Sequence, residues 1–200
     1  EDRFFNYVLE RSRKYSHAVA VSMLSGCRPE ELTSGVIVEL QDDGSIKITI
    51  NGAKTHGKEV AYGQEKRSFC VQTDTAAFDF LKEELGLMGV SAKISIESPN
   101  SFGEQVRKYG KKCFPRIESK ISPYNFRHNF SKKAKQSLSE VGIAQVLGHS
   151  TDRSQDYYSK KNHAGSGFFE ISNIESSSDV KITRTSFDEY LDSTNNSRMY

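Results

Sequence analysis

A helix end and a helix start adjoin in the stretch Ser25-Gly26-Cys27-Arg28-Pro29-Glu30-Glu31-Leu32. Gly26 is suited to end a helix, because glycine adopts the left-handed conformation without strain. Pro29 suits the first turn of a new helix, whose positive dipole end favours the two acids that follow it. Arg28 is therefore expected at a helix start, where backbone N–H groups also point at any bound anion.

Two helices are expected before this stretch and a small sheet after it. Residues 4–9 carry an apolar stripe, and residues 12–23 repeat the helical spacing behind a serine that can cap the helix. Downstream, residues 36–40 form an apolar run, residues 46–50 alternate apolar with polar side chains, and residues 67–72 have the pattern of a short strand. Turn signals separate these runs, which predicts a three-stranded antiparallel sheet.

The rest of the chain is predicted to be mostly helical. Apolar residues recur at helical spacing in residues 74–85, 100–109, 122–134 and 139–147. After residue 161 the sequence is rich in Ser, Asn and Gly, and residues 185–191 have the pattern of a short apolar helix. We therefore expect a mainly helical α+β domain over residues 1–161, followed by a polar, acidic C-terminal tail over residues 162–200.

Charge and composition indicate a polyanionic partner. The 200 residues carry a formal net charge of +2, but residues 105–135 hold ten basic residues and one acid. Such a block suits nucleic acid, although a solvated lysine-rich face is the alternative reading. No apolar run is long enough for a membrane helix, and the three cysteines fit neither a zinc site nor a disulfide framework. We expect a cytoplasmic protein with reduced thiols and no metal or other cofactor.

Two further segments carry side chains suited to phosphate chemistry. In Ser122-Pro123-Tyr124-Asn125-Phe126-Arg127-His128, a helix start places Tyr124 and Arg127 three residues apart on one helix face. Leu147-Gly148-His149-Ser150 is followed by Tyr157-Tyr158-Ser159. Guanidinium groups grip phosphate oxygens through paired planar donors, and a tyrosine can act as a nucleophile.

Taken together and in this order, these segments resemble the tyrosine recombinase and phage integrase family. The family's first arginine segment is matched by residues 25–32, its H-x-x-R-H segment by residues 124–128, and its L-G-H-S by residues 147–150. The family's nucleophilic tyrosine follows that histidine by nine residues, which here is Tyr158, and its lysine lies in a β-turn, where this chain has Lys54. The resemblance covers about residues 13–160.

The resemblance implies a site-specific recombinase or integrase that cuts and rejoins DNA without metal or ATP. Arg28 and Arg127 are expected to hold the scissile phosphate, with His149 as a further donor. Tyr158 is expected to attack the phosphate, leaving a 3′-phosphotyrosine and a free 5′-hydroxyl. Lys54 is the expected proton donor to the leaving oxygen. The sequence leaves open whether the biological reaction is integration, excision or resolution.

Several assignments carry alternatives. Tyr124 stands where the family usually has histidine, and because a phenol is a poor base near pH 7, the group that takes the nucleophile's proton stays open. Tyr157 is the alternative nucleophile, and Lys58 or Lys66 the alternative to the turn lysine. Glu31 matches an acidic position that orients neighbouring groups in the family. The alternative function is a DNA-binding module of the same fold without cleavage, and a topoisomerase-like relative is a third reading.

Double-stranded DNA is the expected partner, and its sequence-specific site cannot be read from this chain. The basic residues that we expect along the DNA backbone are Arg107, Lys108, Lys111, Lys112, Lys132 and Lys133. The resemblance implies a bacterial or phage-encoded protein that forms a tetramer on two duplexes, and it leaves open whether the protein is a monomer without DNA. It also implies a separate N-terminal DNA-binding domain outside this chain. Residues 185–191 are expected to dock, either within the same chain or on a neighbour.

Overall fold

The computed structural model describes residues 1–53, 63–151 and 167–182. About half of these residues lie in helices and the others in a sheet and loops, so the expected α+β class is confirmed. The helices are α1 (Asp2–Leu9), α2 (Arg13–Ser25), α3 (Pro29–Ser34), α4 (Ala76–Met88), α5 (Pro99–Cys113), α6 (Pro123–Ser137) and α7 (Glu140–Leu147). The strands are β1 (Val36–Leu40), β2 (Ile46–Asn51), β3 (Lys66–Thr73), β4 (Ser91–Ile94) and β5 (Phe169–Ser176).

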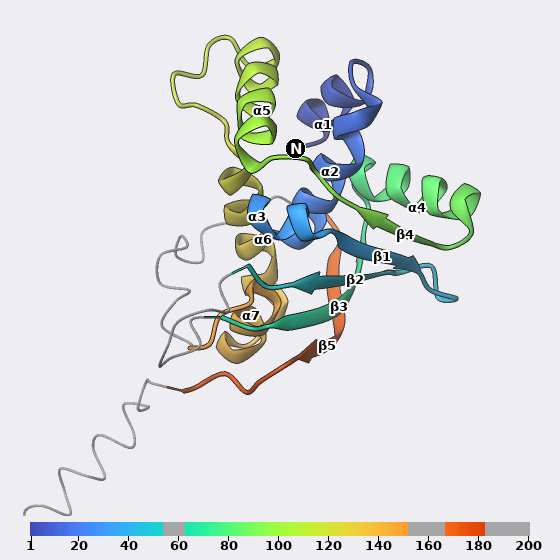
Figure 1. The fold of residues 1–200 in the computed structure, drawn as a ribbon, viewed down its shortest axis with the longest axis vertical. Helices are drawn as coiled ribbons and strands as arrows, with labels where there is room; N and C mark the ends of the chain where they lie inside the picture. Colours follow the sequence, from blue (N-terminus) through green and yellow to red (C-terminus); the bar gives the residue numbers. More distant parts are fainter. Residues whose placement is uncertain (54–62, 152–166, 183–200) are drawn as a thin grey trace, which may run out of the picture.

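The sheet has five strands, so the prediction of three was wrong in number. The order is β4-β1-β2-β3-β5, and every neighbouring pair is antiparallel. The three expected strands form the middle of this sheet (Figure 1). β4 is only four residues long and adds one edge, while β5 adds the other and lies within the residues that the sequence predicts to be a tail.

The pattern of β5 is broken by a bulge, which explains why its sequence does not read as a strand. Ser172 pairs with Cys70 and Glu175 with Ser68, so β5 has one more residue than β3 between these pairs. Asn173 adopts a left-handed conformation with φ 49° at this point. The extra residue shifts the alternation of apolar and polar side chains by one position.

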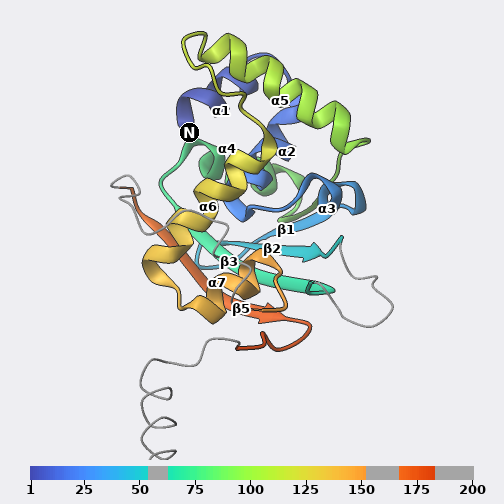
Figure 2. The same ribbon diagram turned by 90° about the vertical axis from the view of Figure 1, so that its left-hand side faces the viewer.

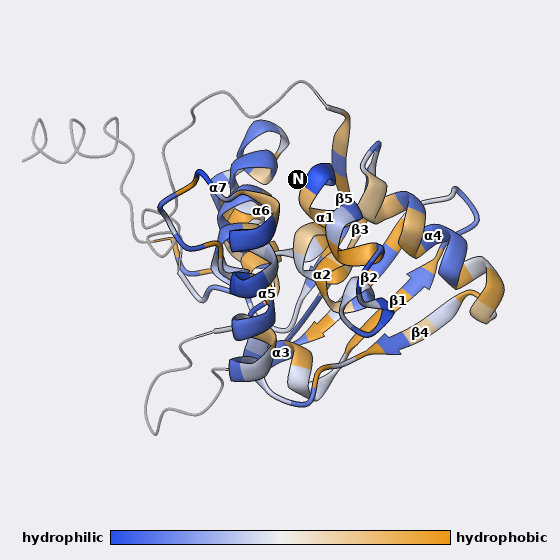
Figure 3. Ribbon diagram, turned by 90° about the horizontal axis from the view of Figure 1, so that it is seen from above, coloured by the Kyte–Doolittle hydropathy of each residue, from blue (hydrophilic) through white to orange (hydrophobic). Residues whose placement is uncertain are grey.

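The helices pack on one face of the sheet around α2. Residues of α2 are buried from Ala18 to its end, and this helix contacts α1, α4 and α6. On α6, Phe130 packs against the rings of Phe69 on β3 and Phe169 on β5, at centroid distances of 5.7 and 5.9 Å. Figure 3 shows apolar segments of the helices turned toward the sheet and hydrophilic segments along α5 and α6 on the outside.

Three ends of helices converge on one side of this core. α2 ends at Gly26 with φ 59°, α3 begins with Pro29 as its first residue, and α7 ends at Gly148 with φ 68°. Figure 2 shows α3, α5, α6 and α7 along this side, with β3 between α7 and α3. The convergence brings together segments that lie more than a hundred residues apart in the sequence.

Two general features of the chain complete this description. The cysteines Cys27, Cys70 and Cys113 are buried and free. No helix within the described residues combines the length and the apolar character needed to cross a membrane.

Candidate functional site

Arg28 is placed by the junction between α2 and α3. It is the residue before the first turn of α3, and its backbone N–H donates to Oε2 of Glu31 at 2.7 Å. Its guanidinium donates from Nη1 to Oε1 of the same carboxylate at 3.1 Å. The side chain is 12% exposed, so its head lies at the edge of the protein interior. One acid thus fixes both the backbone and the side chain of Arg28.

Glu31 is fully buried and is held from the opposite side by Arg67 of β3. Nη1 and Nη2 of Arg67 donate to Oε1 and Oε2 of Glu31 at 3.0 and 2.9 Å, the paired geometry that a guanidinium forms with a carboxylate. The third donor, Nε of Arg67, bonds the carbonyl oxygen of Val146 near the end of α7 at 2.9 Å. Arg67 therefore joins the start of α3 to the end of α7.

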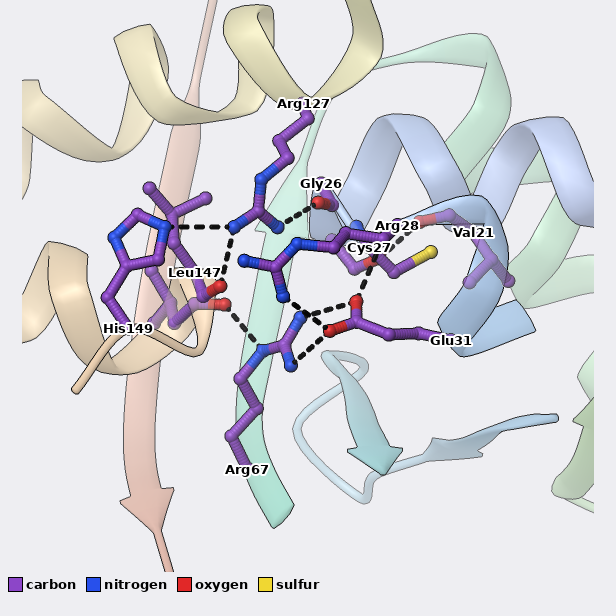
Figure 4. A network of polar contacts seen from close by, with 11 residues as sticks. Val21, Gly26, Cys27, Arg28, Glu31, Arg67, Arg127, Leu147 and His149 are labelled. Atoms are coloured by element: carbon purple, nitrogen blue, oxygen red, sulfur yellow. Dashed lines mark hydrogen bonds and ion pairs between the residues drawn. The ribbon is translucent and has the colours of Figure 1, made fainter. Parts of the chain in front are cut away.

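Arg127 reaches the same place from the first turns of α6. Its Nη1 donates to the carbonyl oxygen of Gly26 at 2.7 Å, and its Nη2 to that of Leu147 at 2.6 Å. Both carbonyls stand at helix ends, where the backbone has no partner within its own helix. Nη2 also lies 3.1 Å from Nε2 of His149. Figure 4 shows the Arg127 and Arg28 guanidinium groups turned toward each other between these helix ends.

His149 is positioned by the glycine that ends α7. Gly148 adopts the left-handed conformation, and the backbone N–H of His149 donates to the carbonyl oxygen of Ala144 at 2.8 Å. The imidazole is buried and Nε2 accepts a hydrogen bond from Arg127, so the neutral ring carries its proton on Nδ1. The ring thus faces a guanidinium as an acceptor.

The charges in this cluster shift the pKa of both titratable partners. Burial lowers the pKa of His149 to about 3, and the charges of Arg127, Arg28 and Arg67 act in the same direction. Burial alone raises the pKa of Glu31, but the charge and hydrogen bonds of Arg67, with the charges of Arg28 and Arg127, outweigh it and lower the pKa to about 2. At neutral pH the cluster contains three positive charges, one negative charge and a neutral imidazole. Its excess positive charge suits an anion.

The fold of this chain is similar to that of two solved structures. The XerA recombinase matches over 99% of this chain with a TM-score of 0.56 and 18% sequence identity. The XerH site-specific recombinase, bound to its difH substrate in a pre-cleavage complex, matches over 78% of this chain with a TM-score of 0.51 and 16% identity. The fold of this chain thus resembles that of these two recombinases. The matches span 62% of the XerA chain and 47% of the XerH chain. No protein-family model and no curated sequence matches this chain.

The structure brings four of the sequence-predicted site residues together and leaves others elsewhere or undescribed. The four are Arg28, Glu31, Arg127 and His149. Tyr124 stands on the first turn of α6 and is 46% exposed. Two of the predicted residues, Lys54 and Tyr158, and two of the alternatives, Lys58 and Tyr157, lie outside the described residues. The predicted docking helix over residues 185–191 lies outside them as well.

The basic residues predicted to contact DNA fall on α5 and α6. Four of them are exposed on the second half of α5, which packs against α3, the helix that begins beside Arg28: Arg107, Lys108, Lys111 and Lys112. On α6, Lys132 is half-buried. Lys133 forms an ion pair with Glu1 and lies 5.3 Å from the ring centroid of Phe169, so its ammonium is engaged on the protein. The roles of all six remain predictions.

Gln64 forms hydrogen bonds to two segments that lie close to the undescribed residues, one around His149 and one after β5. This buried side chain donates from Nε2 to the carbonyl oxygen of His149 at 3.2 Å, and its Oε1 accepts from the backbone N–H of Ser178 at 2.9 Å. The backbone N–H of Gln64 donates to the carbonyl oxygen of Gly148 at 3.3 Å. Residues 63–66, the segment around His149 and the segment after β5 are thus fastened at one point.

Arg67 and Gln64 are the residues of this site that the sequence analysis passes over. For Arg67 a signal existed, because Arg67 alternates with Phe69 and Val71 and therefore shares their buried face. A charged residue in a buried alternation requires a buried partner. Among the described residues, no group of three or more His, Cys, Asp or Glu side chains is placed to bind a metal ion.

Proposed function

We propose that this chain is the catalytic part of a site-specific DNA recombinase that breaks and rejoins strands through a covalent tyrosine intermediate. The observation that carries the proposal is the convergence of Arg28, Arg127 and His149 at three helix ends, from segments 25–32, 122–128 and 147–150. Their excess positive charge and paired donors suit a single phosphate. The fold shared with recombinases supports the same reading.

The proposed reaction exchanges one phosphate ester for another. The Tyr158 hydroxyl oxygen attacks the phosphorus, the bond from phosphorus to the 5′-oxygen breaks, and a 3′-phosphotyrosine remains. Arg28 and Arg127 hold the two non-bridging oxygens, on which charge builds up during attack. A positioned donor of this kind contributes about 3 to 4 kcal/mol to a transition state. Rejoining is the same exchange in reverse on a partner strand, so the ester bond energy is retained.

Two proton transfers complete this exchange. Lys54 gives a proton to the departing 5′-oxygen. Water takes the Tyr158 proton, because both ring nitrogens of His149 are engaged: Nε2 accepts from Arg127 and Nδ1 carries the ring proton. Burial and the arginines also lower the pKa of His149 to about 3, which makes its ring a weak base.

The anchored ends of the undescribed segments support these assignments. Gly52, two residues before Lys54, donates its backbone N–H to the carbonyl oxygen of Glu65, and the neighbouring Gln64 bonds Gly148 and His149. Tyr158 follows Thr151 by seven positions, and an extended chain over seven positions spans at most about 25 Å. The described residues that precede Lys54 and Tyr158 are thus both linked to the segment around His149.

Covalent trapping tests the proposed function. The chain is incubated with short duplexes nicked within a randomised central segment, so that cleavage next to the nick releases a short strand and prevents rejoining. Adducts are then separated under denaturing conditions. We expect a protein–DNA adduct that forms without metal or ATP, is lost with Tyr158→Phe, and falls at least about 100-fold in rate with Arg127→Lys, because a lysine cannot supply paired donors.

The outcomes separate the two candidate functions. Tyr158→Phe is the matched control, since it removes the nucleophilic oxygen and keeps the ring. Binding of the nicked duplexes without any adduct contradicts recombination and supports a DNA-binding module, the function that Tyr124 in place of histidine would allow. An adduct lost with Tyr157→Phe and kept with Tyr158→Phe contradicts the assignment of the nucleophile.

A further inference from the structure

We infer that Arg67 is a positioning residue that sets the spacing of the phosphate-binding groups, an inference that rests on the proposed function. Arg67 on β3 and Arg127 are both only 1% exposed, so the partners of Arg67, and not its burial, distinguish its role from that of Arg127. All three of its nitrogen atoms bond groups that adjoin the proposed site: Glu31 through Nη1 and Nη2, and Val146 through Nε. Figure 4 shows it beneath the other two arginines.

The first contact controls Arg28. Glu31 bonds both the backbone and the guanidinium of Arg28, so the position of its carboxylate determines where that guanidinium lies. Arg67 fixes the carboxylate by bonding both of its oxygens. It also offsets a negative charge that would otherwise oppose an incoming phosphate, which leaves the charges of Arg28 and Arg127 for the substrate.

The second contact controls the opposite side of the site. Arg67 bonds the carbonyl oxygen of Val146 at 2.9 Å, and Arg127 bonds that of the next residue, Leu147, at 2.6 Å. The turn that presents His149 starts at these carbonyls. A methyl group added at Gly148 would lie 2.6 Å from Nη1 of Arg67, so the guanidinium packs directly under this turn. Arg67 therefore sets the distance between the start of α3 and the end of α7.

Stability alone does not account for this buried pair. Replacing a buried ion pair by apolar side chains is often neutral or stabilising, because the desolvation of two charges offsets their attraction. The Arg67–Glu31 pair is fully buried and is bound on both sides to groups of the proposed site. Its arrangement serves the geometry of the arginines above it. A displacement of about 1 Å in such a site can slow a reaction about 100-fold.

The test compares adduct formation and DNA binding in variants of Arg67. The nicked-duplex assay is run at saturating protein, so that the rate of adduct formation is separated from affinity. We expect Arg67→Met to slow adduct formation about 100-fold and to leave DNA affinity within about threefold, because the phosphate-contacting lysines are untouched. Ile48→Val is the matched control, since it removes one buried methyl group from β2 and lowers stability modestly at a residue that pairs with Phe69 and not with Arg67.

Repeating the Arg67→Met measurement in a chain that already carries Glu31→Gln separates positioning from general destabilisation. If Arg67 acts through Glu31, Arg67→Met should slow adduct formation by no more than about threefold further when Glu31→Gln is already present, because residues that act as one unit are not additive. The double variant removes both buried charges and so stays testable if Arg67→Met alone does not fold. Arg67→Lys keeps the charge without the three-way contact and should slow the reaction at least about tenfold.

Three results overturn the inference, and a fourth result overturns the proposed function. Arg67 is not a positioning residue if folded Arg67→Met forms adduct at the parent rate, if Ile48→Val slows it equally, or if the effects of Arg67→Met and Glu31→Gln multiply. If the parent chain forms no adduct, the proposed function fails and the role of Arg67 in that reaction fails with it.

Discussion

Acidification to pH 5 should destabilise this protein through His149. The imidazole is buried against Arg127, with Arg28 and Arg67 nearby, and its pKa falls from 6.5 to about 3 in the folded chain. His149 is therefore protonated below pH 6.5 in the unfolded chain, but only below about pH 3 in the folded chain. Stability is complete above pH 6.5 and is lost as the pH falls through this window.

The size of the effect follows from the two pKa values. pH 5 lies about 1.5 units below the ordinary pKa of histidine, and each of these units costs about 1.36 kcal/mol because only the unfolded chain binds the proton. The free energy of unfolding therefore falls by about 2 kcal/mol between pH 7.5 and pH 5. Glu31 contributes in a lower window, because its pKa falls from 4.5 to about 2 and its stabilisation is lost only below pH 4.5. The interval from pH 7.5 to pH 5 thus separates the contribution of His149 from that of Glu31.

Urea unfolding at pH 7.5 and pH 5, followed by circular dichroism, measures this loss. His149→Gln keeps an acceptor for Arg127 and does not titrate, so its free energy of unfolding should change by less than half as much between the two pH values. His128→Gln is the matched control. The pKa of His128 is lowered by burial and by the charges of Lys132 and Arg127, but that side chain is only half-buried. The reasoning is refuted if His149→Gln retains the full pH dependence of the parent.

Three further predictions follow from the same structure. The exposed lysines of α5 are Lys108, Lys111 and Lys112. Replacing them by glutamine should weaken binding to random-sequence duplex and reduce the slope of log affinity against log salt by about 0.9 for each lost phosphate contact. Lys82→Gln on α4 should change neither the affinity nor the slope. Gln64→Leu should lower the free energy of unfolding by about 1–3 kcal/mol in urea titrations, because the buried carbonyl oxygen of His149 loses its donor; an unchanged midpoint contradicts this. Lys54→Ala should slow adduct formation on ordinary duplexes and be rescued when sulfur replaces the leaving 5′-oxygen, since a thiolate departs without a proton.

Local signals in the sequence predict the framework of the site well. Pro29 and Pro123 each occupy the first turn of a helix, and Gly26 and Gly148 each end one with positive φ, as their residue types require. These four positions place Arg28, Arg127 and His149 at helix ends in the sequence. Their meeting in space depends on the packing of α2 against α6, which no local pattern specifies.

The elements and residues that the sequence did not predict were missed for physical reasons. The two edge strands are missed because β4 is short and because the bulge at Asn173 breaks the alternation of β5. Arg67 is passed over because charged residues in a strand are usually read as solvent-facing, although its alternation with Phe69 places it in the core. The partner that makes this burial acceptable, Glu31, lies 36 residues away in the sequence. Such pairings are set by the tertiary fold.

Mass spectrometry of the trapped adduct tests most directly which residue attacks the phosphate. After the adduct from the nicked duplexes is digested with protease and nuclease, fragmentation of the modified peptide locates the nucleotide. We predict a nucleotide joined through its 3′-phosphate to the oxygen of Tyr158, nine residues beyond the histidine that bonds Arg127. A nucleotide on any other residue, or a 5′-phosphate linkage, would contradict the claim that the two arginines hold the phosphate which Tyr158 attacks.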